Sequence, residues 1–135
     1  MILTQSIEQL ENDYWQETDF PTGLVERCFR YRKIPISDLT PEQLRTLIGQ
    51  QIGLKYLVPL ALKVLEQNLL TEADLYEGDL LASVLDVDAS FWKEYPAIKL
   101  EVQQLILEEK ENIEQRDDIY QFRHLLKKMR AFVSE

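Results

Sequence analysis

The side chains that could carry out chemistry are few in this sequence, and their positions do not suit catalysis. His124 is the only histidine and Cys28 the only cysteine among 135 residues. A catalytic nucleophile needs a base beside it, but His124 falls inside a predicted last helix next to the inward-facing Leu125, which indicates a surface or boundary residue. Cys28 lies on the apolar stripe of another predicted helix, where a buried, inert thiol is expected. We therefore expect no catalytic residues and no enzyme. Paired carboxylates are the one catalytic arrangement that spacing leaves open.

Metal and phosphate sites are also not indicated. A single histidine and a single cysteine exclude the usual zinc ligand sets. Gly49 and Gly53 lie at a predicted helix end without the strand that precedes a phosphate-binding loop, and we expect Gly49 to permit close helix packing. Five carboxylates lie close together, but their spacing does not match a twelve-residue calcium loop: Asp74, Glu77, Asp79, Asp86 and Asp88. The sequence predicts no metal and no cofactor.

The acidic residues are unevenly distributed along the chain. Between Lys63 and Lys93 there is no lysine or arginine, while seven acids occur: Glu66, Glu72, Asp74, Glu77, Asp79, Asp86 and Asp88. An uncompensated block of this kind repels itself, which lowers stability unless the charge is solvated or is used to bind a partner. Asp79 and Asp88 stand where they could cap helices, so part of the block is predicted to be structural.

Two interpretations of this acidic window are open, a solvated face with helix caps or a docking surface. Tyr76, Phe91 and Trp92 favour docking because aromatic side chains anchor interfaces, although Phe91 and Trp92 could equally belong to the core. The docking interpretation predicts these partner-binding residues: Glu72, Asp74, Tyr76, Glu77, Asp86 and Asp88.

Composition restricts the class of partner. Twenty-four acids and fifteen bases give a net charge of −9, which repels phosphate backbones, so we expect no direct contact with nucleic acid or an anionic membrane. The same charge would attract a basic protein, or serve solubility alone. The longest apolar stretch, residues 57–62, is far shorter than the roughly 20 residues of a membrane span. Without a recognisable signal peptide, and with one cysteine, the chain is expected to be cytoplasmic.

Helical periodicity and start signals recur along the whole chain. Ser6 with Gln9, and Thr40 with Pro41 and Gln43, match the pattern of helix-capping boxes. Predicted helices follow at residues 7–11, 24–33, 41–52, 55–67, 79–85, 89–95, 97–115 and 118–132, with Pro59 in the first turn of its helix and Gly53 as a left-handed stop. With only four glycines and five prolines, the chain is expected to be all-α. We predict a compact single-domain bundle of about six to eight helices covering residues 1–135.

Two central segments carry a resemblance to a known family. Residues 44–54 (LRTLIGQQIGL), followed by residues 56–62 (YLVPLAL), resemble the core of the immunity proteins of bacterial contact-dependent growth inhibition systems. Residues 75–81 (LYEGDLL) are similar to an acidic and aromatic Y-x-G-D-L-L motif of that family.

The resemblance covers roughly residues 6–96, since residues 7–11 with Trp15 also fit the family's start. The sequence departs from it at Leu69, where a proline is expected. The resemblance implies an antitoxin that binds and neutralises the C-terminal toxin domain of a contact-dependent growth inhibition effector. Many such toxins are nucleases with basic clefts, so the expected partner is a basic toxin domain, an RNase, held in a one-to-one complex. The alternative is an acidic helical adaptor or regulatory module without a toxin partner.

Overall fold

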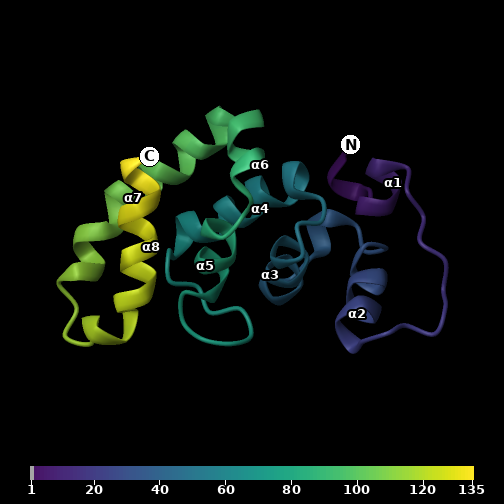
Figure 1. Ribbon diagram of the computed structural model, residues 1–135, viewed down its shortest axis with the longest axis horizontal. Coiled ribbons are helices and arrows are strands. Elements are labelled where there is room, and N and C mark those ends of the chain that lie inside the picture. The colour runs from purple at the N-terminus through teal and green to yellow at the C-terminus, as the bar shows by residue number, and fades with distance from the viewer. Residues whose placement is uncertain (1) are drawn as a thin grey trace.

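Eight α-helices and three short 3-10 helices make up the part of the chain that the structure, a computed structural model, describes, residues 2–135 (Figure 1). In chain order they are η1 (Ile2–Thr4), α1 (Ile7–Glu11), α2 (Gly23–Tyr31), η2 (Ile36–Asp38), α3 (Pro41–Gly49), α4 (Leu54–Gln67), α5 (Asp79–Leu85), α6 (Ala89–Glu94), α7 (Pro96–Glu114), η3 (Ile119–Phe122) and α8 (Arg123–Ser134). No strand occurs among these residues, and the expected all-α class is confirmed.

Helix α4 runs through the middle of the molecule and contacts α3, α5 and α7 (Figure 1). Helices α3 and α5 pack closely on each other, and α5 also contacts α8. Helices α7 and α8 lie side by side at one end, and α1 and α2 lie at the other end (Figure 1). The loop between α4 and α5 lies at the edge of the molecule, midway along its long axis, with bases from both α3 and α8 within reach (Figure 1).

Local start signals fix the first residues of two helices. The Ser6 side chain accepts a hydrogen bond from the Gln9 backbone N–H, and the Gln9 side chain accepts one from the Ser6 N–H at 2.8 Å. Thr40 and Gln43 form the same reciprocal pair at α3, with Pro41 at the first helical position. Both predicted capping boxes are confirmed, because each depends only on residues three positions apart.

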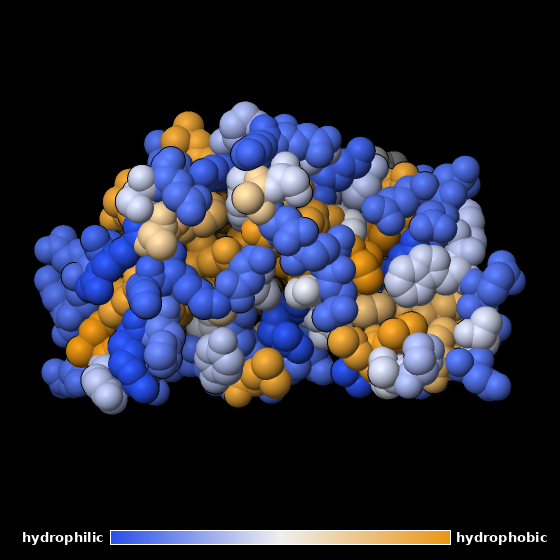
Figure 2. All heavy atoms as spheres, in the orientation of Figure 1, coloured by the Kyte–Doolittle hydropathy of each residue, from blue (hydrophilic) through white to orange (hydrophobic). Residues whose placement is uncertain are grey.

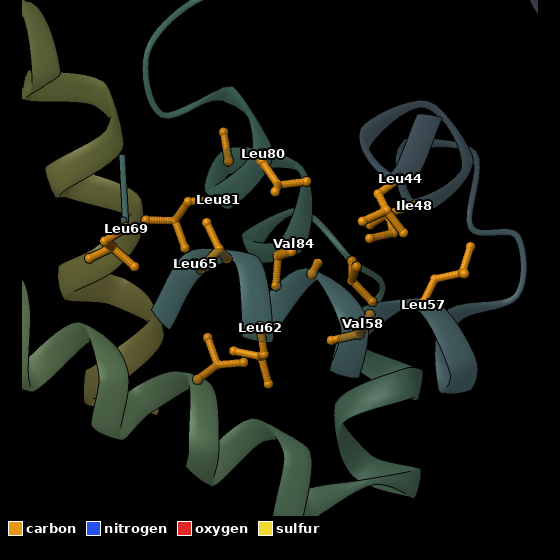
Figure 3. Close-up of a cluster of buried hydrophobic side chains, with 14 of the residues drawn as sticks. Leu44, Ile48, Leu57, Val58, Leu62, Leu65, Leu69, Leu80, Leu81 and Val84 are labelled. Carbon is orange, nitrogen blue, oxygen red and sulfur yellow. The ribbon is translucent and has the colours of Figure 1, made fainter. Parts of the chain in front are cut away.

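Apolar side chains from α3, α4 and α5 meet in the core, as Figure 3 shows for ten labelled residues. Leu44 and Ile48 of α3, Leu57 of α4 and Leu80 of α5 belong to this cluster. All four are at most 2% exposed. The inner face predicted for the last helix is also found, since its apolar side chains are buried apart from the half-buried Ile119: Phe122, Leu125, Leu126, Met129 and Phe132.

Three expectations about turn residues need correction. Pro59 is the sixth residue of α4 rather than part of its first turn, so the helix lacks one backbone donor in its second turn. Gly49 is exposed, and a Cβ added there would meet nothing within 4 Å, so it does not allow close packing. Gly53 is left-handed as predicted (φ +62°), but it caps the start of α4, while Gln51 (φ +60°) takes the left-handed position after α3.

A buried arginine that the sequence did not reveal holds the connector between α1 and α2. The Arg32 side chain is 1% exposed, and its guanidinium lies 4.2 Å from the centre of the Trp15 ring. Its Nη2 donates to the backbone carbonyl of Asp13 at 2.7 Å and lies 3.7 Å from Glu11 Oε1. Stacking and ion pairing offset part of the cost of burying this charge, and they tie the connector to the end of α2.

We expect opposite effects from the same substitution at Gly53 and at Gly49. A Cβ at Gly53 would lie 2.6 Å from Cδ1 of the fully buried Ile7, so Gly53→Ala should lower the free energy of unfolding by about 2 kcal/mol or more. Gly49→Ala, in open space at the end of α3, should raise it by about 0.5–1 kcal/mol. Urea unfolding followed by circular dichroism measures both. If Gly53→Ala left the free energy of unfolding unchanged, the assigned contact with Ile7 would be contradicted.

Candidate functional site

The centre of the acidic window is a loop, residues 68–78, that is built around the carboxylate of Asp79. Asp79 is the first residue of α5, and only 2% of it is exposed. Its Oδ1 accepts the Ala73 N–H at 2.7 Å, and its Oδ2 accepts the N–H groups of Asp74 at 3.0 Å and Leu75 at 2.8 Å. A fourth N–H, from Tyr76, lies at 3.5 Å. Asp79 therefore shapes the loop before the helix. The sequence predicted Asp79 as the N-cap of this helix, but the N-cap residue in the structure is Gly78.

The same contacts set the ionisation of this buried group. Burial by itself would raise the pKa of Asp79, but the backbone N–H donors outweigh it and hold the pKa below its usual range. Arg45 Nε, 4.0 Å from Asp79 Oδ2, adds a positive charge beside the site. A carboxylate in this position stays charged and keeps the loop in one conformation at neutral pH.

Gly78 completes the loop by a backbone conformation that favours glycine. Its φ is +95°, and an added Cβ would lie 2.8 Å from Cδ2 of Leu125 on α8. The Gly78 N–H donates to the carbonyl of Leu70 at 3.1 Å. The next residues, Leu80 and Leu81, are fully buried. The motif Y-x-G-D-L-L thus builds the loop and its junction with the core, and Tyr76 is its only largely exposed member.

Several acids of the window are neutralised by bases from distant parts of the chain. Asp74 forms a two-point ion pair with Arg45 of α3, in which Nη2 lies 3.0 Å from Oδ2. Two further pairs are Arg116 with Glu77 at 3.0 Å and Lys128 of α8 with Asp86 at 2.6 Å. The expectation of an uncompensated block is wrong for these three acids, because the compensating bases lie 29 to 42 positions away in sequence.

Glu72 and Asp88 keep unpaired charges, since neither forms an ion pair within residues 2–135. Glu72 belongs to the loop, where it bridges antiparallel to Glu77 through the backbone. Asp88 occupies the predicted N-cap position of α6, without a side-chain capping bond, and its backbone N–H donates to Gln51 Oε1 at 3.1 Å. These two carboxylates are the members of the predicted set that a partner's bases could approach without breaking an internal pair.

The aromatic residues of the window divide into core and surface. Phe91 and Trp92 are 7% and 5% exposed, so both belong to the core. Tyr76 is 53% exposed and Leu75 is 62% exposed. Hydrophobic atoms accordingly stand out at the tip of the α4–α5 loop against a mainly hydrophilic face (Figure 2). The sequence analysis missed Leu75, although an apolar residue in a polar loop was the available signal.

Tyr76 stands between two shallow hollows. One, of about 230 Å³, is bordered by Arg45 and Gln51 on the side of α3. The other, of about 170 Å³, is bordered by Phe122, His124 and Lys128 on the side of α8. Side chains from a partner could fill such hollows on either side of the ring. The arrangement suits protein binding, in which a protruding aromatic residue and its neighbouring pockets contribute most of the affinity.

The residues first considered for chemistry lie apart from one another. His124 is exposed on α8, at the border of the second hollow, whereas Cys28 is buried in α2, where burial raises the pKa of its thiol. Among the described residues no group of three or more histidine, cysteine or acidic side chains could hold a metal ion. None of the helices in that same part of the chain is long and apolar enough to cross a membrane.

Comparison with known proteins identifies the family. A family described as CDI immunity proteins, where CDI is contact-dependent growth inhibition, matches residues 9–102, about 70% of the chain. The chain therefore belongs to the CDI immunity proteins. The matched segment contains the loop, Asp79 and the α3–α5 core, and it agrees with the resemblance found over residues 6–96. Neither the curated proteins nor the solved structures compared with the chain give a match.

Replacement of Asp79 should produce a pH-dependent loss of stability. Asp79→Asn replaces one acceptor oxygen by a donor that faces backbone N–H groups, so the free energy of unfolding should fall by about 2–3 kcal/mol at pH 7. The Asp79 pKa is lower in the folded than in the unfolded chain. Its charge therefore stabilises the fold above about pH 4, and this contribution is lost as the pH falls through the folded pKa.

The difference between the two proteins should accordingly shrink on acidification, when urea unfolding is repeated between pH 7 and pH 3. A difference that stays constant over this range would show that the charge of Asp79 does not hold the loop.

Proposed function

We propose that this protein is the immunity protein that binds and neutralises the C-terminal toxin domain of a contact-dependent growth inhibition effector. Membership of the CDI immunity proteins carries this proposal. The toxin domain is a nuclease with a basic cleft, an RNase, and the complex is one-to-one. The immunity protein acts in the cytoplasm without a cofactor, and it works by occlusion, with no catalytic step of its own.

The net charge of −9 supports the choice of a nuclease as the partner. A nuclease must hold phosphates, so its active-site cleft carries positive charge. An acidic protein approaches such a cleft faster than a neutral one, and once bound it competes with the substrate for the same charges. An acidic surface that covers the active-site cleft is then enough to neutralise the nuclease.

The contact surface we propose is the α4–α5 loop with the adjoining ends of α5 and α6. Its members are Glu72, Asp74, Tyr76, Glu77, Asp86 and Asp88, to which the exposure of Leu75 adds a seventh. Tyr76 and Leu75 provide the apolar anchor, and Glu72 and Asp88 provide charges free to pair with the toxin. The other three acids contribute less, because toxin bases would have to displace Arg45, Arg116 and Lys128 from them.

The first test is protection. The toxin domain encoded beside this protein is expressed from an inducible promoter in a host that lacks both, with and without the immunity protein. We expect growth arrest without it and growth with it, and we expect the two proteins to co-purify in equal amounts. In an assay with purified proteins, RNA cleavage should stop at one equivalent. Failure to bind or protect would overturn the proposed function, and arrest without cleavage of RNA or DNA would overturn the nuclease assignment.

The free charges should act mainly on the rate of association. Glu72→Gln combined with Asp88→Asn breaks no internal ion pair, so the fold should be unchanged. We expect the association rate with the toxin to fall about three- to tenfold at low salt, and its salt dependence to weaken. Asp19→Asn with Asp38→Asn is the matched control, because these two exposed acids lie outside the window and form no ion pair in the described chain. Equal rates for both double variants would place the contact elsewhere.

The Tyr76 side chain should mainly affect the rate at which the toxin complex dissociates. Tyr76→Ala should weaken toxin binding by about 30-fold or more, chiefly through faster dissociation. Tyr14→Ala is the control, since Tyr14 has the same exposure of 53% and lies in the connector before α2. Surface plasmon resonance gives both rate constants. If Tyr76→Ala bound as tightly as the wild-type protein, the loop would not be the anchor.

A further inference from the structure

An apolar groove of about 470 Å³ lies along α4, outside the acidic window and at the N-terminal end of the molecule. Its walls are Leu3 of η1, Ile36 of η2, and Tyr56, Pro59 and Leu60 of α4. The remaining lining side chains are Lys55 and Lys63. The immunity function proposed above makes no use of this groove.

The groove is positively charged in a protein whose net charge is −9. Lys55 and Lys63 are the only charged side chains that line it, both are exposed, and neither belongs to an ion pair within the described chain. Elsewhere nine of the fifteen bases are paired with carboxylates: Arg30, Arg32, Lys33, Arg45, Lys99, Lys110, Arg116, Lys128 and Arg130. Two of the six free bases thus border one apolar groove.

The spacing along α4 gives the groove a defined pattern. Lys55, Pro59 and Lys63 are four residues apart, so they lie on one side of the helix, and about 12 Å separates the two lysine backbones. The lysine side chains border the two ends of the apolar strip that Pro59 and Leu60 form between them. The ammonium group of Lys55 lies 5.0 Å from the centre of the Tyr56 ring, at one end of the groove.

We propose that this groove binds an acidic segment of a protein partner in which large apolar side chains lie between carboxylates. The apolar side chains fill the strip over Pro59 and Leu60, and the carboxylates pair with Lys55 and Lys63. Charge complementarity is the reason for this choice, because a basic segment would be repelled by both lysines and a neutral one would leave them unused. The groove therefore selects a partner surface opposite in charge to the one expected at the α4–α5 loop.

The chain itself contains a segment of this chemistry, which supplies a probe. Residues 71–78 (TEADLYEG) hold Leu75 and Tyr76 between Glu72, Asp74 and Glu77. A synthetic peptide of this sequence is titrated into the 15N-labelled protein. We expect amide shifts at residues 55–63 with a dissociation constant on the order of 0.1–1 mM, as suits one short anchor with surface ion pairs. A peptide with glutamine and asparagine in place of its acids should bind about fivefold more weakly.

Variants of the two lysines distinguish charge-dependent binding from nonspecific apolar binding. Lys55→Gln with Lys63→Gln should weaken the peptide about fivefold and leave the fold unchanged, since both side chains are exposed and unpaired. Lys93→Gln with Lys127→Gln removes two other exposed, unpaired lysines and should have no effect. If the acidic peptide shifts no groove amide at millimolar concentration, or if the neutral peptide binds equally well, the proposal is overturned.

Analytical ultracentrifugation of the whole protein provides a second test, because it measures self-association. We expect a monomer at all concentrations, together with binding of the peptide, because the proposed partner is a different protein. Self-association that is lost in Lys55→Gln with Lys63→Gln would overturn that choice of partner, since a second copy's loop would then occupy the groove. These outcomes do not depend on the toxin, so failure here leaves the immunity function standing.

Discussion

Four backbone N–H groups converge on one buried carboxylate, that of Asp79, and the exposed loop takes its shape from this contact. Water cannot replace these bonds, because the carboxylate is almost fully buried. The left-handed Gly78 and the buried Leu80 and Leu81 carry the loop into the core. Residues 76–81 therefore build the loop, and Tyr76 is the largely exposed side chain among them.

Acids that look uncompensated in the sequence are partly paired with bases in the structure. A stretch of 29 residues without a base looks like a strongly negative surface, yet three of its acids are paired with Arg45, Arg116 and Lys128. Glu66, Glu72 and Asp88 are left without ion pairs among the described residues, and Glu72 and Asp88 belong to the same proposed surface as the exposed Leu75 and Tyr76. Two of the six bases without ion pairs border the groove along α4. Net charge accordingly describes long-range attraction, whereas recognition depends on the few charges that folding leaves unpaired.

Features that depend on neighbouring residues were predictable, and those that depend on distant ones were not. The capping boxes of Ser6 and Thr40 and the helical stripes follow from spacings of three and four, and the structure confirms them. The partners of Asp74, Glu77 and Asp86 lie 29 to 42 residues away, and no local pattern signals them. The buried Arg32 escaped notice for the same reason, since Trp15 and Asp13 reach it through a long connector. Leu75 was missed because exposure of a loop residue depends on how the loop is folded back.

The ion pairs around the loop also bear on when it can form. Helices and their caps arise from contacts between near neighbours and form early, whereas contacts between distant residues require loops of the chain to be closed first. Lys128 follows Asp86 by 42 positions, and α8 supplies Leu125 to the packing against Gly78. The chain must therefore be synthesised through α8 before the loop is fully supported. A cell that has only begun to synthesise this protein would hold helices but not yet the finished surface.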